Sequence, residues 1–277
     1  MESEGGMRMD YIIIGGDARF GWLARLLRRR GETVGTTFRE AVEGVPALDA
    51  AALARAKRAI VNIPPRLAGS DLSLDELLAL MPEDATVYAC GPGHPHEDGR
   101  VVDLWSDEAM ILENAALTAE GALAAAMKAS DTALRDMRCM VIGWGRIGRA
   151  LTELLVGLGA KATVASRSET GRNRAVERGA EAVPTGEVTA ALPGHRLIFN
   201  TAPGMVLDAD ALRCADGDAM IVDLASPPYG VDLFAAWDLG LRAWREPALP
   251  GRYCPRSAAR ALLNAIDRSE RGGEFND

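Results

Sequence analysis

The stretch that decides the fold is residues 138–158, which read RCMVIGWGRIGRALTELLVGL. Residues 140–142 form a short apolar run typical of a β-strand, and residues 143–148 follow as a glycine-rich turn. Ile147 and four leucines then recur with helical spacing as far as Gly159. The pattern predicts a strand, a tight turn and an amphipathic helix.

The glycines of this turn match the requirements of a dinucleotide-binding Rossmann unit. In such a unit the first glycine permits the turn, the second lets the backbone approach a pyrophosphate, and the third lets helix and strand pack closely. Gly143, Gly145 and Gly148 have this spacing. The pyrophosphate would meet the free N–H groups and the positive dipole end of the helix that begins near Arg146. The alternative is a turn that is glycine-rich for packing alone.

The residues after the second strand of such a unit indicate which nicotinamide cofactor binds. A carboxylate there binds the ribose 2′-hydroxyl and repels a 2′-phosphate. This chain has Ser166-Arg167-Ser168 instead, in which Arg167 can stack on adenine and pair with phosphate. The sequence therefore favours NADP(H) over NAD(H). If Arg167 is a solvated loop charge, either cofactor binds.

Composition and charge exclude several classes of protein. Thirty-one basic and 39 acidic residues among 277 give a formal charge of −8, which argues against nucleic-acid binding. No apolar stretch approaches the length of a membrane span and no signal sequence is visible, so we expect a cytosolic protein. The four cysteines lie far apart, which predicts reduced thiols and no zinc site. His94 and His96 form an H-x-H pair without further ligands nearby, so we expect no metal.

The rest of the chain predicts an α/β protein with two doubly wound parallel-sheet domains joined by long helices, the second being the Rossmann domain. Strands are expected at residues 11–14, 33–38, 59–63, 85–90 and 101–104, and later at 140–142, 162–165, 197–199, 220–224 and 241–244. The expected divisions are a flavodoxin-like substrate domain at 1–118, an interdomain helix at 119–137 capped by Thr118, and an NADP-binding domain at 138–254. The final helix, within 255–277, is expected to pack back on the first domain.

Ligands of doubly wound sheets bind beyond the carboxyl ends of the strands, so three loops of the second domain should border the nicotinamide. The residues predicted to contact the cofactor are Gly143, Trp144, Gly145, Arg146, Ile147, Gly148, Ser166, Arg167, Ser168, Asn200, Thr201, Ala202, Pro203, Asp223, Leu224, Ala225, Leu249 and Pro250. In the first domain, Asp17 is expected to cap a helix while Arg19 faces the interdomain cleft. The alternative is an ordinary surface arginine.

Several motifs outside the glycine turn resemble the dipicolinate synthase A-subunit family, and they follow its order along nearly the whole chain. The segments that carry the resemblance are Gly15 to Arg19, Asn114 to Gly121, Asn200 to Pro203, Asp223 to Ser226, and Leu249 to Ala258. The resemblance implies a two-domain fold related to the formate, glycerate and alanine dehydrogenases. It also implies oxidation of dihydrodipicolinate to dipicolinate together with a smaller flavoprotein-like B-subunit, in the mother-cell cytosol during sporulation.

The chain departs from the family pattern at Leu117, Pro228 and Ala259, where a proline and glycines are expected, and at Arg256, where a lysine is expected. For a small dicarboxylate whose ring becomes aromatic, positioning should dominate catalysis. Our hypothesis is that Arg19 and Arg256 each hold a carboxylate, and that Thr118, Ser226 or Tyr253 orients the ring. By analogy with related enzymes, we expect a homodimer.

Two other functions stay open. A 2-hydroxy-acid dehydrogenase of similar architecture needs a late histidine as general acid-base, but no histidine follows His195. His195 itself is expected at the surface, in the loop before a strand. The other possibility is a non-catalytic NADP-binding protein that senses redox state or docks a partner enzyme.

Overall fold

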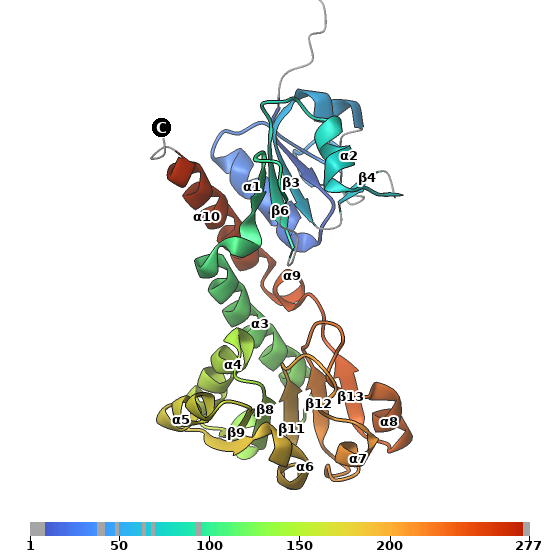
Figure 1. Ribbon diagram of the computed structural model, residues 1–277, viewed down its shortest axis with the longest axis vertical. Coiled ribbons are helices and arrows are strands. Elements are labelled where there is room, and N and C mark those ends of the chain that lie inside the picture. The colour runs from blue at the N-terminus through green and yellow to red at the C-terminus, as the bar shows by residue number, and fades with distance from the viewer. Residues whose placement is uncertain are drawn as a thin grey trace, which may run out of the picture. The chain divides into compact units, whose positions relative to one another are not determined.

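The computed structural model describes residues 9–37, 42–47, 50–62, 65–67, 70–91 and 96–273. The chain divides into two compact units (Figure 1). We call Met1–Asn114 with Pro250–Asp277 unit 1, and Ala115–Leu249 unit 2. The chain therefore leaves unit 1 once and returns to it for its last helix.

The strands are β1 (Met9–Ile14), β2 (Val34–Thr36), β3 (Ala56–Asn62), β4 (Arg66–Leu67), β5 (Ser70–Asp71), β6 (Thr86–Cys90), β7 (Val101–Asp103), β8 (Arg138–Ile142), β9 (Lys161–Ser166), β10 (Glu181–Pro184), β11 (Leu197–Asn200), β12 (Met220–Asp223) and β13 (Arg242–Arg245). The α-helices are α1 (Ala18–Arg29), α2 (Leu74–Ala79), α3 (Glu108–Ala129), α4 (Arg146–Gly157), α5 (Glu169–Glu177), α6 (Val188–Ala191), α7 (Ala209–Leu212), α8 (Leu233–Asp238), α9 (Leu249–Tyr253) and α10 (Pro255–Gly273). Short 3₁₀ turns are η1 (Ala50–Arg55), η2 (Leu104–Ser106), η3 (Leu134–Asp136) and η4 (Thr185–Glu187).

Each unit is built on one parallel sheet. Unit 1 has the strand order β2-β1-β3-β6-β7, and unit 2 has the order β10-β9-β8-β11-β12-β13. Every neighbouring pair in both sheets is parallel. The prediction of an α/β protein with two parallel-sheet domains is confirmed. The carboxyl ends of the strands meet at one edge of each sheet, where ligands of such folds bind.

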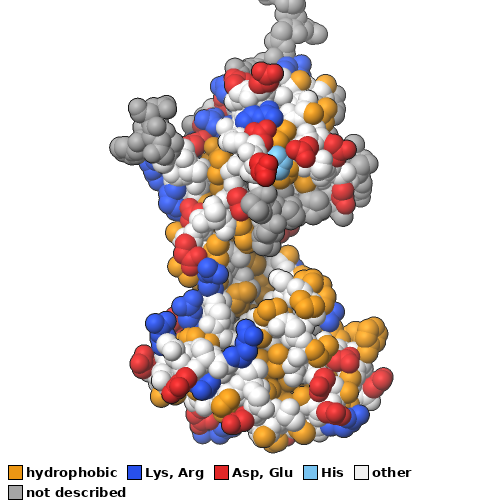
Figure 2. All heavy atoms as spheres, viewed as in Figure 1, with side chains coloured by type: hydrophobic (Ala, Val, Ile, Leu, Met, Phe, Trp, Pro, Cys, Tyr) orange, Lys and Arg blue, Asp and Glu red, His pale blue; other side chains and the backbone are white. Residues whose placement is uncertain are grey.

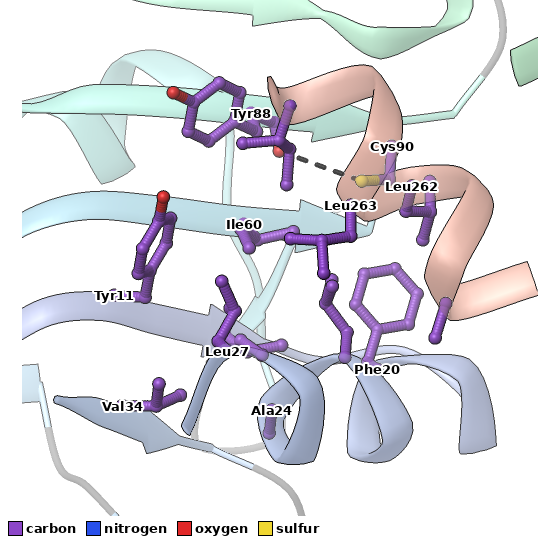
Figure 3. Close-up of a cluster of buried hydrophobic side chains, with 14 of the residues drawn as sticks. Tyr11, Phe20, Ala24, Leu27, Val34, Ile60, Tyr88, Cys90, Leu262 and Leu263 are labelled. Atoms are coloured by element: carbon purple, nitrogen blue, oxygen red, sulfur yellow. Dashed lines mark hydrogen bonds between the residues drawn. The ribbon is translucent and has the colours of Figure 1, made fainter. Parts of the chain in front are cut away.

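Alternating residues of β1 supply two separate cores in unit 1. Tyr11 and Ile13 belong to a cluster formed with α1 and α10, whereas Ile12 and Ile14 belong to a cluster formed with α2 and η1. Figure 3 shows the first cluster, in which side chains of α1 and Leu262 and Leu263 of α10 lie beside the strands. Because successive strand residues face opposite sides, one apolar strand covers both faces of the sheet.

Glu270 is one of the residues that hold α10 against the strands of unit 1. Glu270 Oε1 accepts hydrogen bonds from the Tyr11 hydroxyl at 3.2 Å and the Tyr88 hydroxyl at 3.0 Å, and Arg58 Nε lies 3.0 Å from the same oxygen. Burial raises the pKa of both tyrosines, and the Glu270 carboxylate adds to the rise. The hydroxyls therefore stay protonated and remain donors. The carboxylate thus ties the helix to three strands, β1, β3 and β6.

The helix that runs from one unit into the other begins earlier than the sequence suggests. Thr118 lies inside α3 and is not its N-cap, so that prediction is wrong. The Asp107 carboxylate accepts a hydrogen bond from the Met110 amide at 2.8 Å, which caps the true start. The helix also ends at Ala129, and residues 134–136 form a 3₁₀ turn. Ser130-Asp131-Thr132 lies between α3 and this 3₁₀ turn. Ser130 Oγ accepts from the Thr132 amide and donates to the Thr132 carbonyl, so the side chain competes with the helical hydrogen bonds.

Replacing Glu270 with Ala should loosen α10. Removing a charged acceptor from two tyrosines and an arginine at a half-exposed site should lower the free energy of unfolding by about 1.5–3 kcal/mol. Urea unfolding followed by circular dichroism measures the change. Arg271→Ala, an exposed change in the next residue, is the control and should stay within about 0.5 kcal/mol. Equal stability of the Glu270 variant and the wild type would contradict this role.

Candidate active site

The glycine turn of residues 143–148 connects β8 to α4 as the motif predicts. Gly143 has φ +105°, and a Cβ there would stand 2.5 Å from Thr201 Oγ1. A Cβ on Gly148 would stand 2.1 Å from the Gly143 carbonyl oxygen, so the helix packs on the turn without room for a side chain. Gly145 is different, because no heavy atom of the described residues lies within 4 Å of its Cβ position. The first and third glycines serve the fold, and the second leaves open space.

The start of α4 has the groups that a pyrophosphate needs. Gly145 is its N-cap and has no side chain to cap the first turn, and the start of a helix carries amides that favour an anion. The Nε1 of Trp144, in the same turn, is buried without an acceptor among the described residues. Its ring lies toward α5, where a Cβ on Gly171 would stand 3.0 Å from Trp144 Cδ1. The residues present therefore fit a dinucleotide phosphate at this turn.

Asn200 and Asp223 lie side by side at the ends of β11 and β12, as their register requires. Asn200 Nδ2 donates to Asp223 Oδ1 at 2.8 Å and to the Ala202 carbonyl at 3.0 Å. Asp223 also accepts from the amides of Ala225 and Gly230. Both side chains are almost completely buried. They hold the loops at this edge in position, and their buried side chains are not available to contact a ligand.

An arginine that the sequence analysis did not single out completes this network. Arg245 Nε lies 3.4 Å from the buried Asp223 carboxylate, and its guanidinium lies 3.8 Å from the centre of the Tyr229 ring. Arg245 ends β13, the strand that pairs with β12, and this position at the sheet edge is the feature of the sequence that could have identified it. Arg245 gives the buried carboxylate a positive partner and supports the loop of residues 224–230.

The other predicted cofactor residues belong to the same edge of unit 2. Thr201 Oγ1 donates to the Ile142 carbonyl at 2.9 Å, so this loop backs the glycine turn. Ser166 is buried, Arg167 and Ser168 are exposed, and Ser168 caps α5. Leu249 is buried next to Gly121 of α3, where an added Cβ on the glycine would stand 3.0 Å from the Leu249 Cβ. Pro250 is buried and belongs to unit 1. The remaining predicted positions are partly or fully exposed in the turn and loops of unit 2, and they are Arg146, Ile147, Ala202, Pro203, Leu224 and Ala225.

In unit 1, Arg19 is held in place by Asp17 at the start of α1. Asp17 caps the helix through the Arg19 amide and bonds Arg19 Nε at 2.9 and 3.1 Å. A Cβ on Gly251 would stand 2.1 Å from the Asp17 carboxylate, so two of the resemblance motifs meet here. The Arg19 side chain is only 15% exposed, and its terminal nitrogens have no acceptor among the described residues. Arg19 is therefore a fixed cation with an available edge.

The predicted catalytic residues are divided between the units. Tyr253 and Arg256 belong to unit 1 with Arg19, where Arg252 stacks on Tyr253 and Arg256 stacks on Trp22. Thr118 and Ser226 belong to unit 2, the first buried in α3 and the second exposed after β12. Ala259, one of the departures from the family pattern, is a core residue of unit 1.

The prediction that His195 lies at the surface is wrong. Its ring is 3% exposed, with Nδ1 3.3 Å from the Leu192 carbonyl and Nε2 2.9 Å from Thr163 Oγ1. A carbonyl only accepts, so we assign the proton to Nδ1, and Nε2 accepts from the threonine hydroxyl. Burial lowers the pKa of His195. Its polar groups are satisfied within the fold, which explains why a loop histidine is buried.

The H-x-H pair of His94 and His96 lies only partly within the described residues. His96 lies 3.1 Å from an Asp75 carboxylate oxygen, whereas His94 lies outside the described residues. No group of three or more metal-ligating side chains occurs among the residues that the structure describes. Over the same residues, no helix combines the length and apolar character needed to cross a membrane.

The two parallel-sheet units and the glycine turn define a two-domain Rossmann-type α/β fold, the fold class in which dehydrogenases are found. Within this class, transhydrogenase from Sinorhizobium meliloti matches with TM-score 0.68 and 15% identity, over 93% of this chain and 92% of that one. D-lactate dehydrogenase from Treponema pallidum matches with TM-score 0.58 and 15% identity, over 93% and 94%. At these identities the likeness shows the fold alone.

The particular protein that the chain resembles is the A-subunit of dipicolinate synthase. The crystal structure of that protein from Bacillus halodurans matches with TM-score 0.79 and 24% identity, over 95% of this chain and 98% of that one. The Bacillus subtilis (strain 168) protein is 29% identical over 169 residues, which cover 61% of this chain and 57% of the relative's length. No protein-family model matches the sequence. These comparisons confirm the resemblance inferred from the motifs.

The neutral form of His195 should make stability depend on pH. Because the pKa in the folded state lies below the unfolded value near 6.5, the unfolded state binds the proton more tightly. The contribution is present above about pH 6.5 and is lost as the pH falls toward the folded-state pKa. Urea unfolding between about pH 8 and 5 measures this loss. His195→Gln, which keeps an amide near Thr163, should show a shallower decline, and an identical decline would contradict the assignment.

Proposed function

We propose that this chain is an NADP-dependent oxidoreductase that converts dihydrodipicolinate to dipicolinate, as the resemblance implies. The observation that carries the proposal is the turn at β8 and α4, in which Gly145 leaves space for a phosphate beside helix amides that no side chain caps. The similarity to the dipicolinate synthase A-subunit supports the choice of substrate. The alignment spans just over half of that relative, so activity, substrate and partners are all part of the proposal.

The reaction needs little acid-base catalysis from the protein. The substrate loses a hydride and a proton and becomes an aromatic ring, so the products are dipicolinate, reduced cofactor and H⁺. When bound, the oxidised cofactor supplies the hydride acceptor. The chain's own task is to hold a small dianion in one orientation and to exclude water.

Arg19 is the side chain of unit 1 best suited to hold a carboxylate. Asp17 fixes one edge of its guanidinium and leaves the terminal nitrogens, which can donate to a carboxylate of the substrate. We assign Arg256 to the second carboxylate, and Thr118, Ser226 or Tyr253 to the ring. These assignments follow the motifs that the chain shares with the family.

The cofactor and the assembly extend the same proposal. Ser166-Arg167-Ser168 lacks the carboxylate that binds a ribose 2′-hydroxyl, which supports NADP over NAD. By resemblance, we propose a homodimer that works with the B-subunit of dipicolinate synthase in the cytosol of a sporulating mother cell. A 2-hydroxy-acid dehydrogenase is the weaker candidate, because His195 is buried and no histidine follows it.

One assay tests the proposed function. Purified chain is mixed with NADP⁺ and enzymatically generated dihydrodipicolinate, with and without a B-subunit, while dipicolinate absorbance is followed. Arg19→Ala should lower kcat/KM about tenfold to a hundredfold, the effect of losing a charged hydrogen-bond donor, and leave NADPH binding unchanged. Arg260→Ala, an exposed change on α10, is the matched control. No dipicolinate under either condition would reject the substrate.

Two glycine substitutions test the cofactor site without the reaction. Gly145→Ala should cost about 1 kcal/mol of stability or less, because its Cβ meets open space and only the N-cap is weakened. Its NADPH dissociation constant should rise about tenfold or more, since the methyl occupies the phosphate position. Gly148→Ala should instead destabilise unit 2, because its Cβ meets the Gly143 carbonyl. Calorimetric titration and thermal unfolding separate these effects, and unchanged binding by Gly145→Ala would remove the phosphate from this turn.

A further inference from the structure

The turn after β9 contains an arginine that the glycine motif does not identify. β9 ends at Ser166 and α5 begins at Glu169, so Arg167 and Ser168 form the turn. In a Rossmann unit this turn lies next to the adenosine ribose. The inference below rests on the proposed function, because it concerns how the same dinucleotide site distinguishes its cofactors.

The two serine hydroxyls of this segment serve the turn itself. Ser168 Oγ accepts a hydrogen bond from the Gly171 amide at 3.0 Å and caps α5. A Cβ on Gly171 would stand 2.6 Å from Ser166 Oγ and 2.8 Å from Ser168 Oγ. Both oxygens are therefore packed against the first turn of α5. Both oxygens stabilise the turn, and the Ser166 hydroxyl donates to the Ser168 carbonyl at 3.4 Å, so the two serines do not form a free pair of donors for the ribose.

Arg172 is fixed beneath the same turn. Its Nη1 donates to the Ser166 carbonyl at 2.9 Å and to the Arg167 carbonyl at 3.1 Å, which uses both hydrogens of that nitrogen. Nε and Nη2 share the opposite edge of the planar guanidinium, and neither has an acceptor among the described residues. Two parallel N–H groups on one edge are the arrangement that binds phosphate in a bidentate manner.

The charge of Arg172 is not compensated by the protein. Its partners are neutral carbonyl groups, and no carboxylate among the described residues pairs with it. The side chain is half-buried, so its conformation is already restricted. Figure 2 shows further Lys and Arg side chains over the part of unit 2 that contains α4 and α5. A dianionic group near this turn would meet a fixed positive charge.

Arg167 is less suited to this task although it lies closer to the motif. Its side chain is exposed and has no partner among the described residues. Ordering such a long side chain around a ligand costs conformational entropy that the fixed Arg172 has already lost on folding. Preorganisation therefore favours Arg172 as the stronger contact.

We propose that Arg172 selects NADP(H) over NAD(H) by binding the 2′-phosphate through Nε and Nη2. Arg167 then contributes less, by covering the adenine or adding charge. The two cofactors differ only in this phosphate, so the contribution of Arg172 appears in NADPH binding and not in NADH binding.

Calorimetric titration of the full chain with NADPH and NADH tests the proposal. Arg172→Ala should raise the NADPH dissociation constant about tenfold to a hundredfold and the NADH constant less than about threefold. Arg172→Lys should fall between wild type and Arg172→Ala, because lysine keeps the charge but not the bidentate edge. Arg174→Ala, an exposed arginine on the same helix, is the matched control and should change neither constant. Thermal unfolding of each variant shows whether the turn stays folded.

The outcomes separate this inference from the proposed function. If Arg172→Ala weakens NADPH and NADH equally, or only lowers the unfolding temperature, Arg172 merely supports the turn and the inference is overturned. A larger loss of NADPH affinity in Arg167→Ala overturns it too. If the wild-type chain binds neither cofactor, the proposed function fails, and the inference fails with it.

Discussion

The close approach of α4 to the end of β8 is the constraint on which the arrangement of unit 2 depends. Gly148 lies so close to the Gly143 carbonyl that no side chain fits between them. This contact aims the first amides of α4 at the space beside Gly145, and Thr201 supports the turn from behind. Because the turn cannot move without separating helix from strand, the amides proposed to bind phosphate are fixed by the fold itself.

A buried carboxylate extends this order across the sheet edge. Asp223 is removed from water, and that cost is offset by two backbone amides, the Asn200 amide and the Arg245 guanidinium. The amides belong to the loop of residues 224–230, and Asn200 and Arg245 stand at the ends of the neighbouring strands β11 and β13, so the loop and the strand ends hold one another in position. Asn200 and Asp223 are predicted from the sequence to contact the cofactor. Both side chains are buried and hydrogen-bonded to the loops, so in the structure they position loop backbone.

The sequence was most informative where backbone geometry demands one residue type. The glycine turn and the parallel strands could be predicted because only glycine fits the turn and because fully buried strands are apolar throughout. Thr118 and His195 could not be placed, since the start of α3 depends on a cap at Asp107 and His195 on contacts with Thr163. Asp107 is one of several polar residues that could cap this helix, and the contact of Thr163 with His195 joins residues 32 positions apart, which a local pattern does not record.

The two fixed arginines differ in what compensates their charge, and this difference suits different anions. Arg19 shares its charge with the Asp17 carboxylate, so an approaching anion meets a partly neutralised pair. Arg172 is held by neutral carbonyls and keeps its full charge. A carboxylate carries one negative charge, so the geometry of its hydrogen bonds matters more than the net charge of its partner. A phosphate monoester carries nearly two negative charges. The carboxylate partner in unit 1 and the carbonyl partners in unit 2 therefore match each arginine to the charge of the group proposed for it.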